Sequence, residues 1–456
     1  MTTSVRNNPR TIFGWAMYDW ANSAYITAGS LVFAILFSEV IFPSDGLTIG
    51  GTTIGAEAFF GIIVGVGALL LFLAMPVLGA VADYTDAKKK LLRFFAYTGA
   101  AFAVLTALPG EGDLLLAAVL ALGAQIGFAA GNVMYDGFLP EITTPETVDK
   151  VSAKGFAYGY AGGGLHLILS VALLLFADQL GLAEGTAQRI VIVSAGIWWA
   201  AFATFAFTRL HEDGTGQTLP DTADEGVSRR LPTRAGGRLL AYARLGFQRT
   251  WRTARNLVNY KQLALFLLAF LFYNDGVATA IRITPVYATE TLQLSAELIA
   301  GAFVVIQLVA LVGALLFGWL AGVLGTKRAI MLSIAGWALV AISAFLLPAE
   351  EPVGFLAVGA LAGLVLGGVQ ALSRSLYASM IPADSSAEFF GFYSVFSKSS
   401  AIFGPLLFAA VGIATGSSRL AILFLVLFFI LGAILLSRVD VEAGRAAKDK
   451  PRPVAA

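Results

Sequence analysis

Two short stretches far apart in the chain decide its architecture: residues Tyr18–Ala24 read YDWANSA, and residues Tyr273–Ala280 read YNDGVATA. Each lies in a long apolar segment, and in each an Asp (Asp19 or Asp275) is followed four residues later by Ser or Thr. Residues four apart share one face of a helix. A carboxylate inside a membrane segment is costly and marks a functional site by default. Two matching acids predict a duplicated protein with a polar site between its halves.

The composition of the 456-residue chain is that of a membrane protein. Hydrophobic residues make up 58% and charged residues 13%, whereas soluble domains carry about 25% charged residues. The chain has no Cys and two His, which argues against thiol chemistry and against a metal enzyme. A net charge of +1 gives no basic field for nucleic acid. We therefore expect no enzymatic activity, no cofactor and no metal.

Apolar runs long enough to span about 30 Å of bilayer recur along the whole chain. In the first half we predict spans at Phe13–Phe42, Glu57–Ala82, Leu91–Leu108, Leu114–Tyr135, Gly155–Phe176 and Ile190–Phe207. In the second half we predict Leu263–Tyr287, Leu298–Leu320, Ile330–Leu347, Val353–Leu376, Phe389–Ala414 and Leu420–Leu436. These runs predict an all-α membrane protein of twelve helices.

The distribution of basic residues predicts the orientation in the membrane. Alternate connections, at 43–56, 109–113, 178–188, 288–297, 348–352 and 415–418, contain no Lys or Arg. Nearly all the basic residues fall instead in the N-terminal segment, the other connections and the C-terminal tail. Because basic residues stay on the cytoplasmic side, both termini are expected in the cytoplasm.

The longest connection separates two sets of six spans. We therefore divide the chain into an N-terminal half (1–208), a cytoplasmic linker (209–261), a C-terminal half (262–437) and a cytoplasmic tail (438–456). The second part of the linker is rich in Arg and could form an amphipathic helix on anionic lipid. A solvated linker explains the same charges equally well.

The two halves repeat each other at further positions. Gly79, Asp83 and Lys88 have the same spacing after the second span as Gly318, Gly322 and Lys327 have after the eighth. Asn132, Tyr135 and Pro140 correspond in the same way to Arg374, Tyr377 and Pro382. Repeated halves with a site at the bilayer midplane are the usual plan of secondary transporters.

The motifs of the chain resemble those of a known family. Six spans, a long loop and six more resemble the major facilitator superfamily, and residues 79–90 (GAVADYTDAKKK) are similar to its signature loop, departing at Tyr84 and Asp86. Six stretches resemble the vacuole-effluxer-like, autophagy-linked branch: YDWANSAY from Tyr18, FLPEI from Phe138, YGYAGGG from Tyr158, YNDG from Tyr273, GVQALSRSL from Gly368 and EFFGFY from Glu388. The resemblance implies transport, and for fungal members it implies export of amino acids from the vacuole.

Polar residues inside the predicted spans are candidates for binding substrate or protons. Asp275 lies near the midplane, where it could carry protons, bind a substrate ammonium or pair with a buried cation; a structural ion pair is the alternative. Lys398 must face a cavity or a partner. His166 is as readily a hydrogen-bonded core residue. The predicted site comprises Asp275, Lys398, Arg282, His166, Asn22 and Asn274, although the Asn side chains would serve equally well as interhelical hydrogen bonds.

A second group of residues lies at the predicted cytoplasmic ends of the spans. Asp83 could accept N–H groups from a helix N-terminus or pair with a basic residue, and the resemblance implies a gating latch there; simple anchoring by the neighbouring lysines is the alternative. Asp19 could carry protons, but we favour an ion pair between the halves with Arg374. The predicted gate is therefore Asp83, Lys88, Asp19 and Arg374.

Together these features predict a secondary active transporter in the inner membrane, acting as a monomer among membrane lipids. We expect it to move a small polar or zwitterionic solute, with amino acids as candidates. Lys398 or Arg282 would bind a carboxylate and Asp275 an ammonium. Protons are the expected coupling ion, since the spans hold acids and a His and the chain has no evident ATPase motif. An exporter of lipids or hydrophobic compounds, and a non-transporting receptor or scaffold, remain the alternatives.

Overall fold

The computed structural model describes residues 6–49, 52–85, 87–183, 185–210 and 260–448. In the N-terminal half the helices are α1 (Pro9–Ala24), α2 (Ser30–Leu36), α3 (Ala56–Thr85), α4 (Lys88–Leu105), α5 (Leu114–Gly137), α6 (Leu139–Ile142), α7 (Val148–Leu175) and α8 (Thr186–Phe207). In the C-terminal half they are α11 (Lys261–Val286), α12 (Ala296–Leu324), α13 (Thr326–Leu346), α14 (Pro352–Met380), α15 (Ser386–Thr415), α16 (Ser418–Ser437) and α17 (Val441–Lys448).

The first predicted span is a rod of consecutive helical segments of different type, rather than one uniform α-helix. α1 and α2 are joined by a π-helical turn, Tyr25–Gly29, and a second such turn, Phe37–Ile41, ends the rod. A third π-helical turn, Tyr287–Thr291, ends α11 in the other half. The connection after the rod contains a short antiparallel hairpin, β1 (Leu47–Ile49) and β2 (Thr52–Ile54). A 3-10 turn, Ala383–Ser385, leads into α15.

The prediction of an all-α membrane protein is confirmed. Within the described residues, 10 helical segments are long and apolar enough to cross a membrane. α4 and α15 overlap the other two predicted spans, but neither is among these segments. The count of twelve therefore stays a prediction. Most of the predicted linker, residues 211–259, lies outside the described part of the chain, and so does its expected surface helix.

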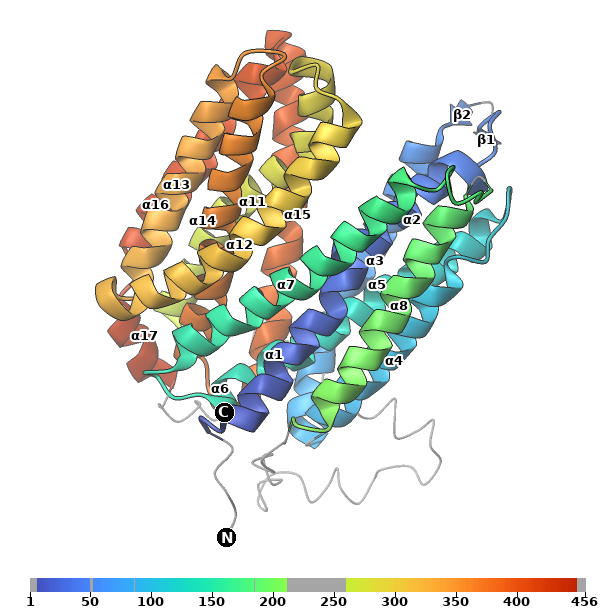
Figure 1. Cartoon of the computed structure of the whole chain (residues 1–456). Helices are drawn as coiled ribbons and strands as arrows, with labels where there is room; N and C mark the ends of the chain where they lie inside the picture. The colour runs from blue at the N-terminus through green and yellow to red at the C-terminus, as the bar shows by residue number, and fades with distance from the viewer. Residues whose placement is uncertain (1–5, 50–51, 86, 184, 211–259, 449–456) are drawn as a thin grey trace.

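The helices form two bundles that lie side by side (Figure 1). We call α1–α8 the N-terminal bundle and α11–α16 the C-terminal bundle. α7 packs against α12 and α14, and α3 packs against α15. The start of α1, the short α6 and α17 all lie at one end of the molecule (Figure 1). We call this the α6 end, and the opposite end, which carries β1 and β2, the hairpin end.

Small residues allow the two bundles to approach closely near the α6 end. A Cβ at Gly79 of α3 would overlap the backbone oxygen of Ala387 in α15. A Cβ at Gly391 of α15 would lie 2.6 Å from the Cα of Pro76 in α3, well inside normal contact. Close backbone approach through small residues is how membrane helices gain packing energy. The α6 end is therefore where the bundles are most tightly joined.

Candidate functional site

A cavity of about 1060 Å³ lies between the two bundles. Its lining comes from the Tyr25–Gly29 turn, α2, α3, α5 and α7 on one side and from α11, α12, α13, α14 and α16 on the other, with Lys398 of α15. Most of the lining is apolar, with Phe33, Phe60, Phe128, Phe303 and Phe355 among it. The polar members include Thr27, Ser30, Gln125, Tyr160, Arg282, Gln307, Gln370 and Lys398. An apolar cavity with a few placed polar groups is the usual form of a small-molecule site.

A direct hydrogen bond joins the two bundles at the end of the cavity nearer the α6 end. Tyr160 of α7 donates a hydrogen bond to Gln370 Oε1 of α14 at 2.6 Å, and both residues line the cavity. Below this contact, toward the α6 end, the bundles are held together by the polar groups described next. The cavity therefore ends where the interface between the bundles begins.

Two of the predicted site residues, Lys398 and Arg282, line the cavity. Lys398 is partly buried, and it forms no ion pair within the described part of the chain. Arg282 is exposed. The lining includes no Asp or Glu among the described residues. The charge that the cavity presents to a ligand is therefore positive.

Asp275 is buried behind the cavity wall rather than in it. Its side chain is 1% exposed, and its Oδ1 accepts hydrogen bonds from the backbone N–H of Gly404 at 3.0 Å and from the Thr279 hydroxyl at 3.5 Å. Gly404 is needed there because a Cβ would lie 2.8 Å from Asp275 Oδ1. The acid and the Thr four residues later thus form one polar contact between α11 and α15.

The other three predicted site residues also lie within their own bundle. His166 is 3% exposed, and its ring nitrogens lie 3.1 Å from Ser194 Oγ and 3.2 Å from Ser170 Oγ. Asn22 donates to Asn132 Oδ1 at 2.7 Å. Asn274 donates to the backbone oxygen of Ser397 at 3.4 Å. Their surroundings are those of interhelical hydrogen bonds, and the structure does not bring them together with Lys398 and Arg282.

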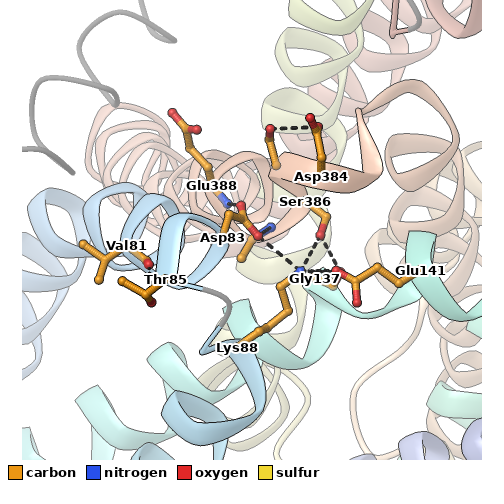
Figure 2. A network of polar contacts seen from close by, with 11 residues as sticks. Val81, Asp83, Thr85, Lys88, Gly137, Glu141, Asp384, Ser386 and Glu388 are labelled. Atoms are coloured by element: carbon orange, nitrogen blue, oxygen red, sulfur yellow. Dashed lines mark hydrogen bonds and ion pairs between the residues drawn. The ribbon is translucent and has the colours of Figure 1, made fainter. Parts of the chain in front are cut away.

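At the α6 end, the carboxylate of Asp83 caps a helix of the other bundle (Figure 2). It accepts the backbone N–H groups of Ala387 at 3.2 Å and Glu388 at 2.8 Å, in the first turn of α15. The N-cap residue of α15, Ser385, makes no side-chain capping bond of its own. The first N–H groups of a helix need acceptors, and a negative charge there is stabilising. Asp83 supplies both from across the interface; we call this contact the Asp83 latch.

Lys88 ties the Asp83 latch to the rest of its bundle (Figure 2). Its Nζ lies 3.2 Å from Asp83 Oδ1, forms an ion pair with Glu141 of α6, and donates to Ser386 Oγ at 2.8 Å. Ser386 in turn donates to the backbone oxygen of Gly137 at 2.6 Å. The buried ammonium group of Lys88 therefore contacts two carboxylates of its own bundle and one hydroxyl of the other bundle.

Arg374 of α14 is the second buried cation at the α6 end. Its Nη1 lies 3.0 Å from Asp136 Oδ1 and 3.7 Å from Asp19 Oδ2, both in the N-terminal bundle. Its other nitrogens donate to the hydroxyl and the backbone oxygen of Ser152, each at 3.0 Å. The guanidinium also lies 4.1 Å from the ring centre of Phe156. One side chain of the C-terminal bundle thus satisfies groups on α1, α5 and α7.

A third contact between the bundles was not predicted from the sequence. Asp149 of α7 accepts the hydroxyl of Thr326 at 2.7 Å through Oδ2 and the hydroxyl of Ser375 through Oδ1. Asp136, Glu141 and Ser152 were missed as well. The only sequence signal was position: each lies near the α6 end of a span, as Asp83 and Arg374 do.

The comparisons with known proteins agree with this arrangement. A family model described as "Vacuole effluxer Atg22 like" matches residues 7–449. The MFS-type transporter YxiO of Bacillus subtilis (strain 168) is 32% identical over 431 residues, which cover 94% of each chain. Autophagy-related protein 22-1 of Phaeosphaeria nodorum is 26% identical over 445 residues, covering 86% of this chain and 78% of that relative.

Solved structures share the fold. The proton:xylose symporter XylE of the major facilitator superfamily (MFS) aligns with a TM-score of 0.69 at 15% identity, over 96% of this chain and 99% of its own. A bacterial homologue of the iron transporter ferroportin aligns with a TM-score of 0.61 at 14% identity, over 94% and 98%. At these identities the likeness concerns the fold, and the predicted MFS fold is confirmed. The chain belongs to the vacuole effluxer Atg22-like family, whose members are MFS-type transporters and not enzymes.

Proposed function

We propose that this protein is a secondary active transporter that moves a small solute by alternating access through the cavity between its bundles. The observation that carries the proposal is the contrast between the two ends of that cavity. Toward the α6 end the bundles are joined by buried polar contacts, whereas the cavity occupies the space between them toward the hairpin end. Rocking of two repeats around a central site is the common mechanism of such folds.

The orientation that we propose places the α6 end in the cytoplasm of a cell with this protein in its inner membrane. The support is that Lys88, Lys150 and Lys327 lie in the first turns of α4, α7 and α13, which begin at that end (Figure 1). The positive-inside rule puts basic residues at the ends of spans on the cytoplasmic side. Both termini would then be cytoplasmic. In this orientation the structure is outward-facing, with its cytoplasmic side closed.

The gate that we propose consists of the Asp83 latch, Lys88, and Arg374 with its two carboxylates. Asp83, Lys88 and Arg374 are buried, Asp19 and Asp136 are partly buried, and all of them link the bundles or support a residue that does. Opening the cytoplasmic side would separate Asp83 from α15 and Arg374 from Asp19 and Asp136. The number and strength of these contacts would set how often the closed gate opens.

The solute that we propose is small and carries a carboxylate, with amino acids as the candidates implied by the family. Lys398 and Arg282 line the cavity and offer positive charge to such a group. A substrate ammonium would contact the amide oxygens of Gln125, Gln307 or Gln370 rather than Asp275, which does not line the cavity. Export from the cell is the proposed direction.

Coupling to protons is part of the proposal, and Asp275 is the residue to test. Purified protein in proteoliposomes should take up labelled amino acid more strongly when a pH gradient is imposed. If an Asp275→Asn variant concentrates the solute with undiminished dependence on the gradient, Asp275 is not the proton carrier. Gln188→Asn, a change at an exposed amide outside the cavity lining, is the matched control for handling and reconstitution.

A second candidate, export of a lipid or another hydrophobic compound, is favoured by the apolar character of the cavity wall. A thermal-shift screen of amino acids, peptides and lipids on purified protein separates the two, because a ligand stabilises the folded state according to its affinity. Stabilisation by lipids alone would overturn the amino-acid assignment while leaving transport in place.

A further inference from the structure

The charge of the cavity wall carries an inference that rests on the proposed function and sharpens it. Lys398 and Arg282 are the charged residues among the described lining, and no described lining residue is acidic. A zwitterion needs an acceptor for its ammonium as well as a donor for its carboxylate. The cavity wall offers formal positive charge to the carboxylate of a zwitterion, but its described residues offer no formal negative charge to the ammonium.

The two cations stand at different depths. Lys398 follows the first residue of α15 by 12 positions, which is about 18 Å along a helix that rises about 1.5 Å per residue. Arg282 follows the first residue of α11 by 21 positions, or about 32 Å. Both helices begin at the α6 end, where Tyr260 and Phe389 pack together with ring centres 5.9 Å apart. Lys398 therefore lies deep in the cavity and Arg282 nearer the hairpin end.

The surroundings of the two cations also differ. Arg282 is exposed. Lys398 is partly buried, and it forms no ion pair with a carboxylate among the described residues. A buried charge without a partner is costly unless a ligand supplies one. A single negative charge on the ligand would compensate Lys398, and Arg282 would draw that ligand inward, because a cleft of one sign concentrates opposite charge.

We infer that, among solutes with a carboxylate, the cavity binds an organic monocarboxylate with an apolar body in preference to a zwitterion of the same shape. The carboxylate would pair with Lys398 at depth, while the apolar body packs against the Phe-rich wall. The amide N–H groups of Gln307 and Gln370 would complete the hydrogen bonds around the carboxylate. A free ammonium on the same molecule would face one or both cations without an acid to balance it.

The test compares three compounds that share one apolar body and differ in charge: 3-phenylpropanoate, L-phenylalanine and 2-phenylethylamine. Thermal stability of the full-length protein in detergent measures their binding, and octanoate is added as a second monocarboxylate of different shape. We expect both carboxylates to stabilise the protein more than phenylalanine does, and phenylethylamine not at all. Tighter binding of the zwitterion or the amine, or no binding of either carboxylate, would overturn the inference.

Variants at Lys398 test whether the carboxylate of the ligand binds at this residue. Lys398→Gln should weaken 3-phenylpropanoate binding about thirtyfold or more, the usual loss for one partner of a desolvated charge pair. Lys398→Arg should retain most of it. Lys90→Gln, which removes an exposed Lys outside the cavity lining, is the control. Unchanged binding in Lys398→Gln would contradict the inference, and if that variant does not fold, the ligand series on the unchanged protein decides.

The outcome is separable from that of the proposed function. If proteoliposomes transport phenylalanine in preference to the carboxylates, transport stands and the anion selectivity is wrong. If the carboxylates bind but no compound in the series crosses the membrane, the selectivity stands and transport is in doubt.

Discussion

The substitution Asp83→Asn tests the proposed gate most directly. Asp83 accepts two backbone N–H groups in the first turn of α15 and lies 3.2 Å from the ammonium of Lys88. Asn keeps one acceptor oxygen, but its amide N–H₂ group would face the second backbone N–H of α15, and a donor cannot accept that hydrogen bond. One buried N–H then loses its partner, which costs about 1–3 kcal/mol. Loss of the charge at the helix N-terminus adds about 1 kcal/mol.

Only the state with the α6 end closed has this contact, so the whole cost falls on that state. A destabilisation of about 3 kcal/mol changes the ratio of two conformations about 150-fold. A protein that spends about 99% of its time with the cytoplasmic side closed would then spend about 40% of its time in that state. The Asp83→Asn variant should therefore populate the opposite, inward-facing state heavily.

The chain has no Cys, so one introduced thiol reports the change without background. Ser30 lines the cavity, and its hydroxyl bonds only to its own helix, at the oxygen of Ile26. In right-side-out vesicles, Ser30→Cys should react with a membrane-impermeant maleimide, and adding Asp83→Asn should slow the reaction. The matched control is Asp440→Asn, because Asp440 also caps a helix, through the Ala443 N–H at 2.9 Å, but within one half of the chain. Equal labelling rates in both variants would refute the latch.

Three further predictions use the same interface. Gly79→Ala should slow the labelling of Ser30→Cys, because its Cβ overlaps the backbone of α15, whereas Gly322→Ala, with nothing within 4 Å of its Cβ, should not. Arg374→Gln should lower the free energy of unfolding by about 3 kcal/mol, since it leaves two partly buried carboxylates without their cation; adding Asp136→Asn should restore part of the loss. Asp149→Asn should slow the labelling less than Asp83→Asn does, because its partners are two hydroxyls and such bonds contribute about 1 kcal/mol each.

The fold could be predicted from the sequence because the signals were long and repeated. Apolar length gives the spans, and the matched spacing of Gly79 and Gly318 gives the duplication. The three π-helical turns and the β1–β2 hairpin could not be predicted this way, since they depend on local backbone geometry. α4 is not among the helices apolar enough to cross a membrane, because it begins with Lys88-Lys89-Lys90. From the sequence alone, these three lysines are predicted to belong to the connection before the span.

How far along each helix a site residue lies could be predicted from the sequence, but which way its side chain faces could not. Position along a helix predicted that Asp83, Asp19 and Arg374 lie near one end and that Asp275 and Lys398 lie farther in. In the structure, Asp83 and Arg374 bond across the interface at the α6 end, and Lys398 lines the cavity. Which way a side chain faces depends on how each helix is rotated against its neighbours, and one sequence does not contain that information. Asp275 faces α15 because Gly404 leaves room for it, whereas Lys398, on the same α15, faces the cavity.

The carboxylates that bond across the interface at the α6 end are Asp19, Asp83, Asp136 and Asp149, and all four lie on the N-terminal bundle. Their partners on the other bundle are all donors: a guanidinium, two hydroxyls and two backbone N–H groups. The repeat places Gly322 where the first half has Asp83. Gly322 is exposed, with nothing within 4 Å of the position that a Cβ would take. The second half therefore has no counterpart of the Asp83 latch at the matching position, and the carboxylates of this interface come from one bundle although the two halves repeat each other in sequence.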